Sequence, residues 1–90
     1  MKKKIIKVKN KMGLHARPSS LLVRVVSQYT STHVTILKDN FKVNGKSIMG
    51  VMALAASYDS VLCFIVDGPE EDDMLDSIDK LFKSQFNESK

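Results

Sequence analysis

Hydrophobic and polar residues alternate at the start of the chain, and the period then changes several times along it. Ile6 and Val8 alternate with lysines, which predicts a first strand that turns these two side chains inward. Between Ala16 and Tyr29 the apolar residues recur at helical spacing, which predicts a helix with one apolar face. The members of that face are Leu22, Val25, Val26 and Tyr29.

The middle of the chain predicts two short strands and a short helix. Residues 33–37 and 41–43 have strand composition and are separated by a turn at residues 38–40. Residues 47–56 then favour a helix, and Ser47 is of the type that caps a helix N-terminus.

The last third of the chain predicts a strand and a helix. The continuous apolar run from Val61 to Val66 is typical of a strand buried on both faces. Pro69 is expected at the first position of a helix whose early acids, residues 70–73, complement the helix dipole. The buried stripe of that helix is predicted to be Leu75, Ile78, Leu81 and Phe82. The order strand, helix, strand, strand, helix, strand, helix indicates an α+β fold with helices on one face of an antiparallel sheet.

Composition is that of an ordinary globular domain, with 43% hydrophobic and 27% charged residues among 90. This length predicts one domain over residues 1–90. The lysines at the start are not followed by the apolar run of a signal peptide, and no run approaches the roughly 18–20 residues of a membrane span. We therefore expect a cytoplasmic protein without membrane contact. Cys63 is interpreted as a small buried hydrophobe.

The net charge of +4 favours acidic partners. Nucleic acid is not expected as a partner because no aromatic platform or DNA- or RNA-binding motif accompanies the lysines. The acids at residues 70–73 are not expected to hold a metal, since consecutive helical residues point in different directions. We predict no cofactor, and we interpret His33 as a strand-face residue.

The segment from residue 10 to residue 18 carries the strongest chemical signal. Gly13 permits a tight turn and Pro18 fits the first turn of a helix, so His15 is expected at a helix N-terminus. The backbone N–H groups of Ala16 and Arg17, together with the positive end of the helix dipole, predict an anion site.

This position suits phosphoryl transfer through the imidazole. The dipole disfavours imidazolium, so the ring of His15 is expected to keep a nucleophilic lone pair near pH 7. Arg17 can offer a fork of donors to phosphate oxygens. The residues alone leave open the alternative that His15 is an ordinary surface or capping residue.

Two motifs resemble those of a known family. Gly13-Leu14-His15-Ala16-Arg17-Pro18 resembles the active-site signature of HPr, the histidine phosphocarrier of the bacterial sugar phosphotransferase system. Gly45-Lys46-Ser47-Ile48-Met49-Gly50-Val51-Met52 resembles the regulatory-serine region of the same family. The two motifs have the family's separation, and the order of elements matches along essentially the whole chain. The resemblance implies an open-faced β-sandwich in which three helices cover one face of a four-stranded antiparallel sheet.

The resemblance also implies a function. Enzyme I, charged from phosphoenolpyruvate, would phosphorylate His15, and His15 would pass the group to an Enzyme IIA domain. Arg17 and the N–H groups of Ala16 and Arg17 would stabilise the phosphoryl group. Such a protein is a monomeric carrier and a substrate of enzymes rather than an enzyme.

Partners of the family dock on the first two helices. The matching positions are Ser20, Leu21, Arg24, Ile48, Met49 and Met52. The alternative for Met49 and Met52 is packing in the core, since methionines at helical spacing are commonly buried.

Ser47 has two compatible interpretations. It is a helix cap, and in the family it is phosphorylated by an HPr kinase/phosphorylase, which places negative charge in the docking surface. A competing hypothesis makes regulation through Ser47 the main output, and a nitrogen-related phosphorelay is a further branch. His15 and Arg17 argue against a purely regulatory form, because regulation through Ser47 does not need them.

Three positions depart from the family pattern. Met12 stands where small or polar residues are usual, which puts the packing near the active centre in doubt. Ala55 and Asp59 stand where the family commonly has glycine, so we expect a differently shaped loop before Val61.

Overall fold

The computed structural model describes residues 1–87 and has the predicted element order, βαββαβα, followed by a short 3₁₀ turn. The elements are β1 (Lys2–Lys7), α1 (Ala16–Ser27), β2 (His33–Lys38), β3 (Phe41–Asn44), α2 (Ile48–Ala53), β4 (Val61–Asp67), α3 (Glu71–Lys83) and η1 (Gln85–Asn87). Neighbouring strands are antiparallel, and their order across the sheet is β1-β4-β2-β3. These findings confirm the α+β class and the four-stranded antiparallel sheet.

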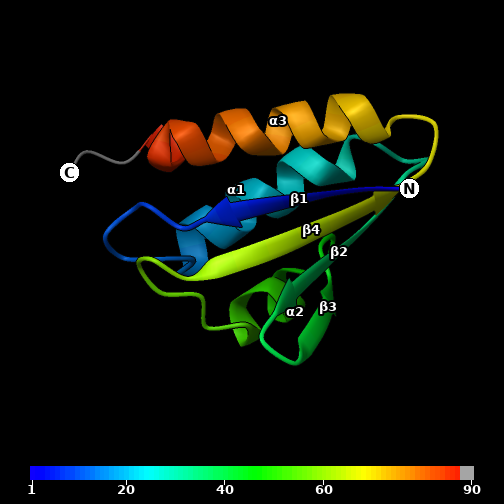
Figure 1. Cartoon of the computed structure of the whole chain (residues 1–90). Helices are drawn as coiled ribbons and strands as arrows, with labels where there is room; N and C mark the ends of the chain where they lie inside the picture. Colours follow the sequence, from blue (N-terminus) through cyan, green and yellow to red (C-terminus); the bar gives the residue numbers. More distant parts are fainter. Residues whose placement is uncertain (88–90) are drawn as a thin grey trace.

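The helices cover one face of the sheet, and α3 runs alongside β1 and β4 in Figure 1. Burial alternates along β1, β2 and β4, as expected when only one face of a sheet packs on a core. The strand side chains that are buried on the helix side are Ile6, Val34, Ile36, Leu62, Phe64 and Val66. The fold is therefore the predicted open-faced sandwich.

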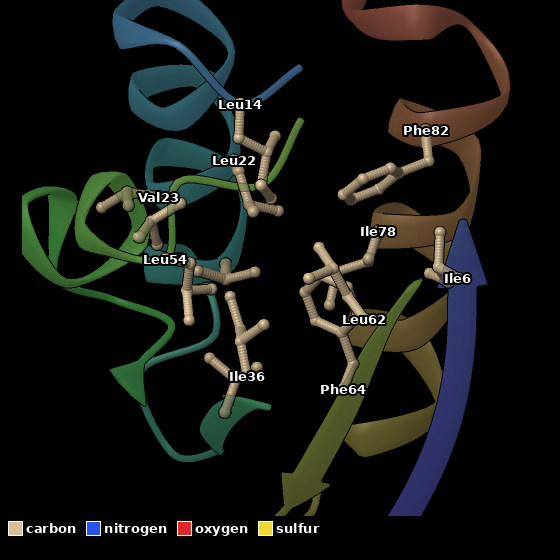
Figure 2. Packing of buried hydrophobic residues seen from close by; sticks show 14 of the residues in the cluster. Ile6, Leu14, Leu22, Val23, Ile36, Leu54, Leu62, Phe64, Ile78 and Phe82 are labelled. Atoms are coloured by element: carbon tan, nitrogen blue, oxygen red, sulfur yellow. The ribbon is translucent and has the colours of Figure 1, made fainter. Parts of the chain in front are cut away.

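The core lies between the helices and these strand residues. Figure 2 shows Leu22 and Val23 of α1 on one side of the cluster and Ile78 and Phe82 of α3 on the other. Phe82 also meets Phe86 of η1 edge-on, with ring centroids 4.8 Å apart. Phe86 is fully buried and has left-handed backbone (φ 57°), so this C-terminal turn folds a side chain back into the core. The pattern of the sequence did not predict this turn.

Helix boundaries differ from the predicted ones by a few residues. α1 ends at Ser27, so Tyr29 lies beyond the helix, although it still packs against the core. The buried stripe of α1 contains Val23, whereas Val25 is only half-buried, because the stripe is centred one residue earlier than predicted. α2 ends at Ala53 rather than at residue 56.

The last helix begins later than predicted, and its buried stripe keeps the predicted Ile78 and Phe82 and adds Met74. Pro69 precedes Glu70, the N-cap residue, and therefore lies outside the helix. The buried side chains of α3 recur every four residues: Met74, Ile78 and Phe82. Leu75 and Leu81 flank this stripe and are only partly buried. None of the helices within residues 1–87 is long and apolar enough to cross a membrane.

The prediction that β4 is buried on both faces is wrong. Leu62, Phe64 and Val66 face the helices, but Val61 on the opposite face is 53% exposed. Cys63 lies on this same face and is only half-buried, so its interpretation as a buried hydrophobe is also wrong. A continuous apolar run shows that the side chains on both faces of a strand are apolar. It does not show that other elements of the chain cover both faces.

Candidate functional site

His15 lies where the sequence places it, at the start of α1. It is the N-cap residue, with extended backbone (φ −78°, ψ −167°), and its exposed side chain does not cap its own helix. The carbonyl of His15 accepts the first hydrogen bond of the helix from the N–H of Ser19, with an N···O distance of 3.0 Å. The imidazole is therefore on the surface at the positive end of a helix of 12 residues.

The backbone just before His15 is held by contacts with two loops. Gly13 has left-handed backbone (φ 68°), and a Cβ there would lie 2.4 Å from the carbonyl oxygen of Ala56. The Asn10 side-chain amide donates to the carbonyl of Gly13 at 2.6 Å, and the N–H of Leu14 donates to Ala56 at 2.8 Å. Only glycine fits at position 13, and these contacts fix the backbone of the turn that precedes His15.

Donors and positive charge gather around the imidazole. An α-helix supplies no carbonyl to the N–H groups of its first turn, which here includes the exposed residues Ala16 and Arg17. The Nη2 atom of Arg17 donates to the carbonyl of Phe86 at 2.6 Å, so the guanidinium reaches from α1 to the C-terminal turn. This contact was not predicted, although Phe86 follows Phe82 at helical spacing. The arrangement can hold a small anion beside His15.

Ser47 is the N-cap residue of α2, which confirms its predicted structural role. Its Oγ accepts a hydrogen bond from the N–H of Gly50 at 3.0 Å, and its backbone is extended (φ −105°, ψ 117°). The side chain is half-buried rather than fully enclosed.

The two helices that carry His15 and Ser47 pack against each other in opposite directions. Lys46, just before α2, donates from Nζ to the carbonyl of Tyr29, just after α1, at 2.7 Å. At the other end, the loop after α2 meets the His15 turn through the bond from Leu14 to Ala56. The 12 residues of α1 span about 18 Å. His15 and Ser47 therefore lie at opposite ends of one surface built from α1 and α2.

The six predicted docking residues all lie on these two helices. Their exposure differs: Arg24, Ile48, Met49 and Met52 are exposed, whereas Ser20 and Leu21 are half-buried. Met49 is 83% exposed and Met52 is 43% exposed, so the alternative that they pack in the core is wrong. The face of α2 presents large apolar side chains to solvent, an arrangement typical of protein-binding surfaces.

The three positions that depart from the family pattern lie in the turn before His15 and in the loop that leads to β4. Met12 is 73% exposed at the turn before Gly13. Ala55 and Asp59 have positive φ values of 51° and 75°. The loop before β4 thus adopts, at both positions, the left-handed backbone that favours glycine, although neither residue is glycine.

The remaining candidates do not converge on a second site. His33 is exposed at the start of β2, opposite Asp67 of β4. The acids near α3 contact separate partners: Glu70 accepts from the N–H of Ser31, Glu71 pairs with the α-amino group of Met1, and Asp72 pairs with Lys2. Within residues 1–87 no three His, Cys, Asp or Glu residues gather in a group that could hold a metal ion.

Comparison with known proteins shows the family to which the chain is similar. Residues 2–84 match the family model described as "PTS HPr component phosphorylation site". The phosphocarrier protein HPr of Treponema pallidum is 44% identical over 85 residues, which cover 94% of this chain and 96% of that protein.

Solved structures give the same result. A crystal structure of HPr from Thermoanaerobacter tengcongensis superposes with a TM-score of 0.94 at 41% identity, covering all of both chains. The catabolite-repression protein Crh of Bacillus subtilis, described as a swapped dimer, has a TM-score of 0.73 at 35% identity over 94% of this chain and 97% of that one.

Proposed function

This chain belongs to the HPr family, the phosphocarriers of the phosphotransferase system, and on that premise we propose that it accepts a phosphoryl group from Enzyme I on His15 and donates it to an Enzyme IIA domain. The observation that carries the proposal is the exposed imidazole at the N-terminus of α1, with Arg17 two residues away. A phosphocarrier is a substrate of its partners, so the site has to bind and release the group rather than transform it.

The transfer uses a ring nitrogen of His15 as nucleophile. Its lone pair attacks the phosphorus, a P–N bond forms, and the bond between phosphorus and the donor group breaks. The N–H groups of the first turn and the guanidinium of Arg17 bind the phosphoryl oxygens. In the return step an Enzyme IIA nucleophile attacks the same phosphorus and the P–N bond breaks.

Docking on α1 and α2 completes the proposal. The apolar side chains of Ile48, Met49 and Met52 make contact, and Arg24 and Arg17 attract partners with an acidic rim. We propose that the protein works in the cytoplasm, where these partners meet it.

The decisive experiment incubates the protein with Enzyme I and labelled phosphoenolpyruvate. The chain has two histidines, so His33→Ala is a matched control for His15→Ala. We expect acid-labile label on the wild-type protein and on His33→Ala, and none on His15→Ala. Labelling of His15→Ala, or an absence of label on the wild-type protein, would contradict the carrier proposal.

Ser47 is proposed as a second phosphorylation site, used by an HPr kinase/phosphorylase. Its half-buried hydroxyl accepts one backbone hydrogen bond, and it sits next to the exposed apolar residues of α2. With ATP and the cognate kinase we expect acid-stable label that is lost in Ser47→Ala and kept in Ser27→Ala. Label that persists in Ser47→Ala would refute the assignment.

A second candidate function is regulation without sugar transport. It is favoured by the similarity to Crh, whose name refers to catabolite repression. The test above separates the two functions, because a purely regulatory protein would take label at Ser47 and none at His15. We propose that the working form is a monomer, although relatives have been described as dimers. Sedimentation at micromolar concentration decides between these states.

A further inference from the structure

The open face of the sheet has an apolar centre that folding does not explain. Ile5 of β1 lies opposite Cys63 of β4, and Cys63 lies opposite Leu37 of β2, so the three side chains form a row across the sheet. Val61 and Ile65 extend the row on β4. Ile5 is 69% exposed and Val61 is 53% exposed. Antiparallel sheets that face water usually carry polar residues on that face.

Lysines surround this apolar row. Lys3 and Lys7 of β1 and Lys42 of β3 share the open face, because they pair with Ile65, Val61 and Leu37 respectively. Two carboxylates lie at the ends of the face, and each is already close to a cation. Asp59 is 3.7 Å from Lys7, and Asp67 is 3.7 Å from the α-amino group of Met1. The three lysines and the α-amino group of Met1 outnumber the two carboxylates, so the face combines an apolar centre with a rim of net positive charge.

A second copy of this chain is a poor occupant for the face. In a two-fold pairing the same three lysines would approach one another. The four strands cover roughly 14 Å by 20 Å, or about 300 Å², whereas a stable interface buries about 800 Å² on each partner. A small, positively rimmed face fits a transient partner of opposite charge.

We propose that the open face binds an acidic amphipathic helix of a partner protein, independently of the His15 surface. Helices are the usual cover for a sheet face, and the row from Ile5 to Leu37 spans about 10 Å, which is the width of one helix. The aliphatic stripe of that helix covers the row, and its flanking carboxylates meet Lys3, Lys7 and Lys42. Because α1 and α2 lie on the opposite side of the sheet, a phosphotransfer partner and this helix bind at the same time.

A designed peptide tests the proposal with the full-length protein. The probe is a helical peptide of about sixteen residues with leucine at i, i+3, i+4 and i+7 and glutamate on both flanks. Its control is the same peptide with lysine in place of glutamate. We expect saturable amide NMR shifts on β1, β4 and β2 with the acidic peptide and none with the basic one. The affinity should fall as salt rises.

Variants of the chain locate the contact. Ile5→Ser and Val61→Ser should each weaken peptide binding by about fivefold or more. Phe41→Ser is the matched control: Phe41 is also 69% exposed, but it pairs with Lys38, in phase with the buried Ile36, and so lies on the helix side of the sheet. It should bind the peptide as the wild-type protein does. Ile5→Ser should also accept label at His15 at the wild-type rate.

Several results would overturn the proposal. They are an absence of saturable shifts in the wild-type protein, shifts confined to α1 and α2, or equal affinity in Ile5→Ser and the wild-type protein. Binding to phosphatidylserine vesicles without peptide binding would assign the face to lipid instead. Dimerisation that disappears in Ile5→Ser would assign it to a second copy. None of these results affects the labelling of His15, so the two proposals fail separately.

Discussion

The guanidinium of Arg17 donates to the carbonyl of Phe86 in this structure, and the proposed transfer gives it a second acceptor, a phosphoryl group on His15. Its planar fork suits both, since a carbonyl and a phosphate oxygen can be bound at once by different N–H groups. Replacing Arg17 with lysine keeps the positive charge but removes the forked pair of N–H donors, and replacing it with alanine removes both.

Arg17→Ala should therefore slow phosphoryl transfer at saturating Enzyme I by about tenfold or more. The rate of Arg17→Lys should lie between those of Arg17→Ala and the wild-type protein. The lost bond to Phe86 should lower the free energy of unfolding by only about 1 kcal/mol. Single-turnover labelling and urea denaturation measure the two effects. A loss of several kcal/mol with an unchanged transfer rate would make Arg17 a structural residue.

Ala55 has a backbone conformation that its side chain disfavours. An L-residue in the left-handed region costs about 1–2 kcal/mol, and glycine avoids this cost but loses about 0.5–1 kcal/mol of chain entropy. Ala55→Gly should therefore raise the free energy of unfolding by about 0.5–1 kcal/mol. Ala53→Gly, at an exposed helical position two residues earlier, should lower it by a similar amount. Urea denaturation checks both signs, and equal signs would contradict the explanation.

At the scale of elements, β1 is joined to α3 by a series of ion pairs. The α-amino group of Met1 pairs with Glu71 at 3.2 Å, Lys2 pairs with Asp72, and Lys4 pairs with Asp79 at 3.2 Å. Asp79 also pairs with Lys83 one turn later at 2.9 Å. The lysine-rich start of the chain is thus partly paired with the acids of the chain's own last helix.

These pairs predict an acid-sensitive contribution to stability. A hydrogen bond from Lys83, followed by one from Lys4, lowers the pKa of Asp79, and a hydrogen bond from the Met1 amino group lowers the pKa of Glu71. A lowered folded-state pKa stabilises the fold above the unfolded value, near pH 4, and this contribution disappears as pH falls through the folded value.

Asp79→Asn should lose stability at pH 7 and show a weaker decline between pH 5 and pH 2. Asp76→Asn is the control, because its pair with Lys80 at 3.1 Å is exposed on both sides. Urea denaturation at a series of pH values measures the slopes. The same slope in Asp79→Asn as in the wild-type protein would show that the pair does not couple stability to pH.

At the scale of the whole molecule, the two proposed phosphorylation sites lie at opposite ends of the surface built from α1 and α2. The 12 residues of α1 alone span about 18 Å, whereas the Debye length in physiological salt is roughly 8 Å. We therefore expect a charge on Ser47 to act on partners that cover this surface and to have little direct effect on the imidazole.

Ser47→Asp should raise the KM of Enzyme I for this protein severalfold and leave the rate of phosphorylation at saturation nearly unchanged. Aspartate is as good an N-cap as serine, so the helix should be kept. Asn40→Asp adds the same charge at the turn between β2 and β3 and serves as the control. Initial rates over a range of concentrations of each variant separate an effect on KM from an effect on the saturating rate. A fall in the saturating rate with an unchanged KM would contradict a docking effect.

Local patterns in the sequence determined much of this molecule. The alternation of Ile6 and Val8, the cap at Ser47 and the position of His15 before Pro18 all follow from neighbours within a few residues. Each depends on backbone geometry that a short segment fixes by itself. For the same reason the α+β class and the order of elements could be predicted, together with the motif that relates the chain to HPr.

Tertiary structure alone decided the features that depend on distant parts of the chain. Only packing shows that β4 is covered on one face, that Met49 and Met52 are exposed, and that Phe86 closes the core. It also brings Arg17 to Phe86, 69 positions away, and holds Ala55 in a left-handed conformation. The periodicity of a segment states which side chains are alike, whereas the fold decides which of them meet another layer and which meet solvent.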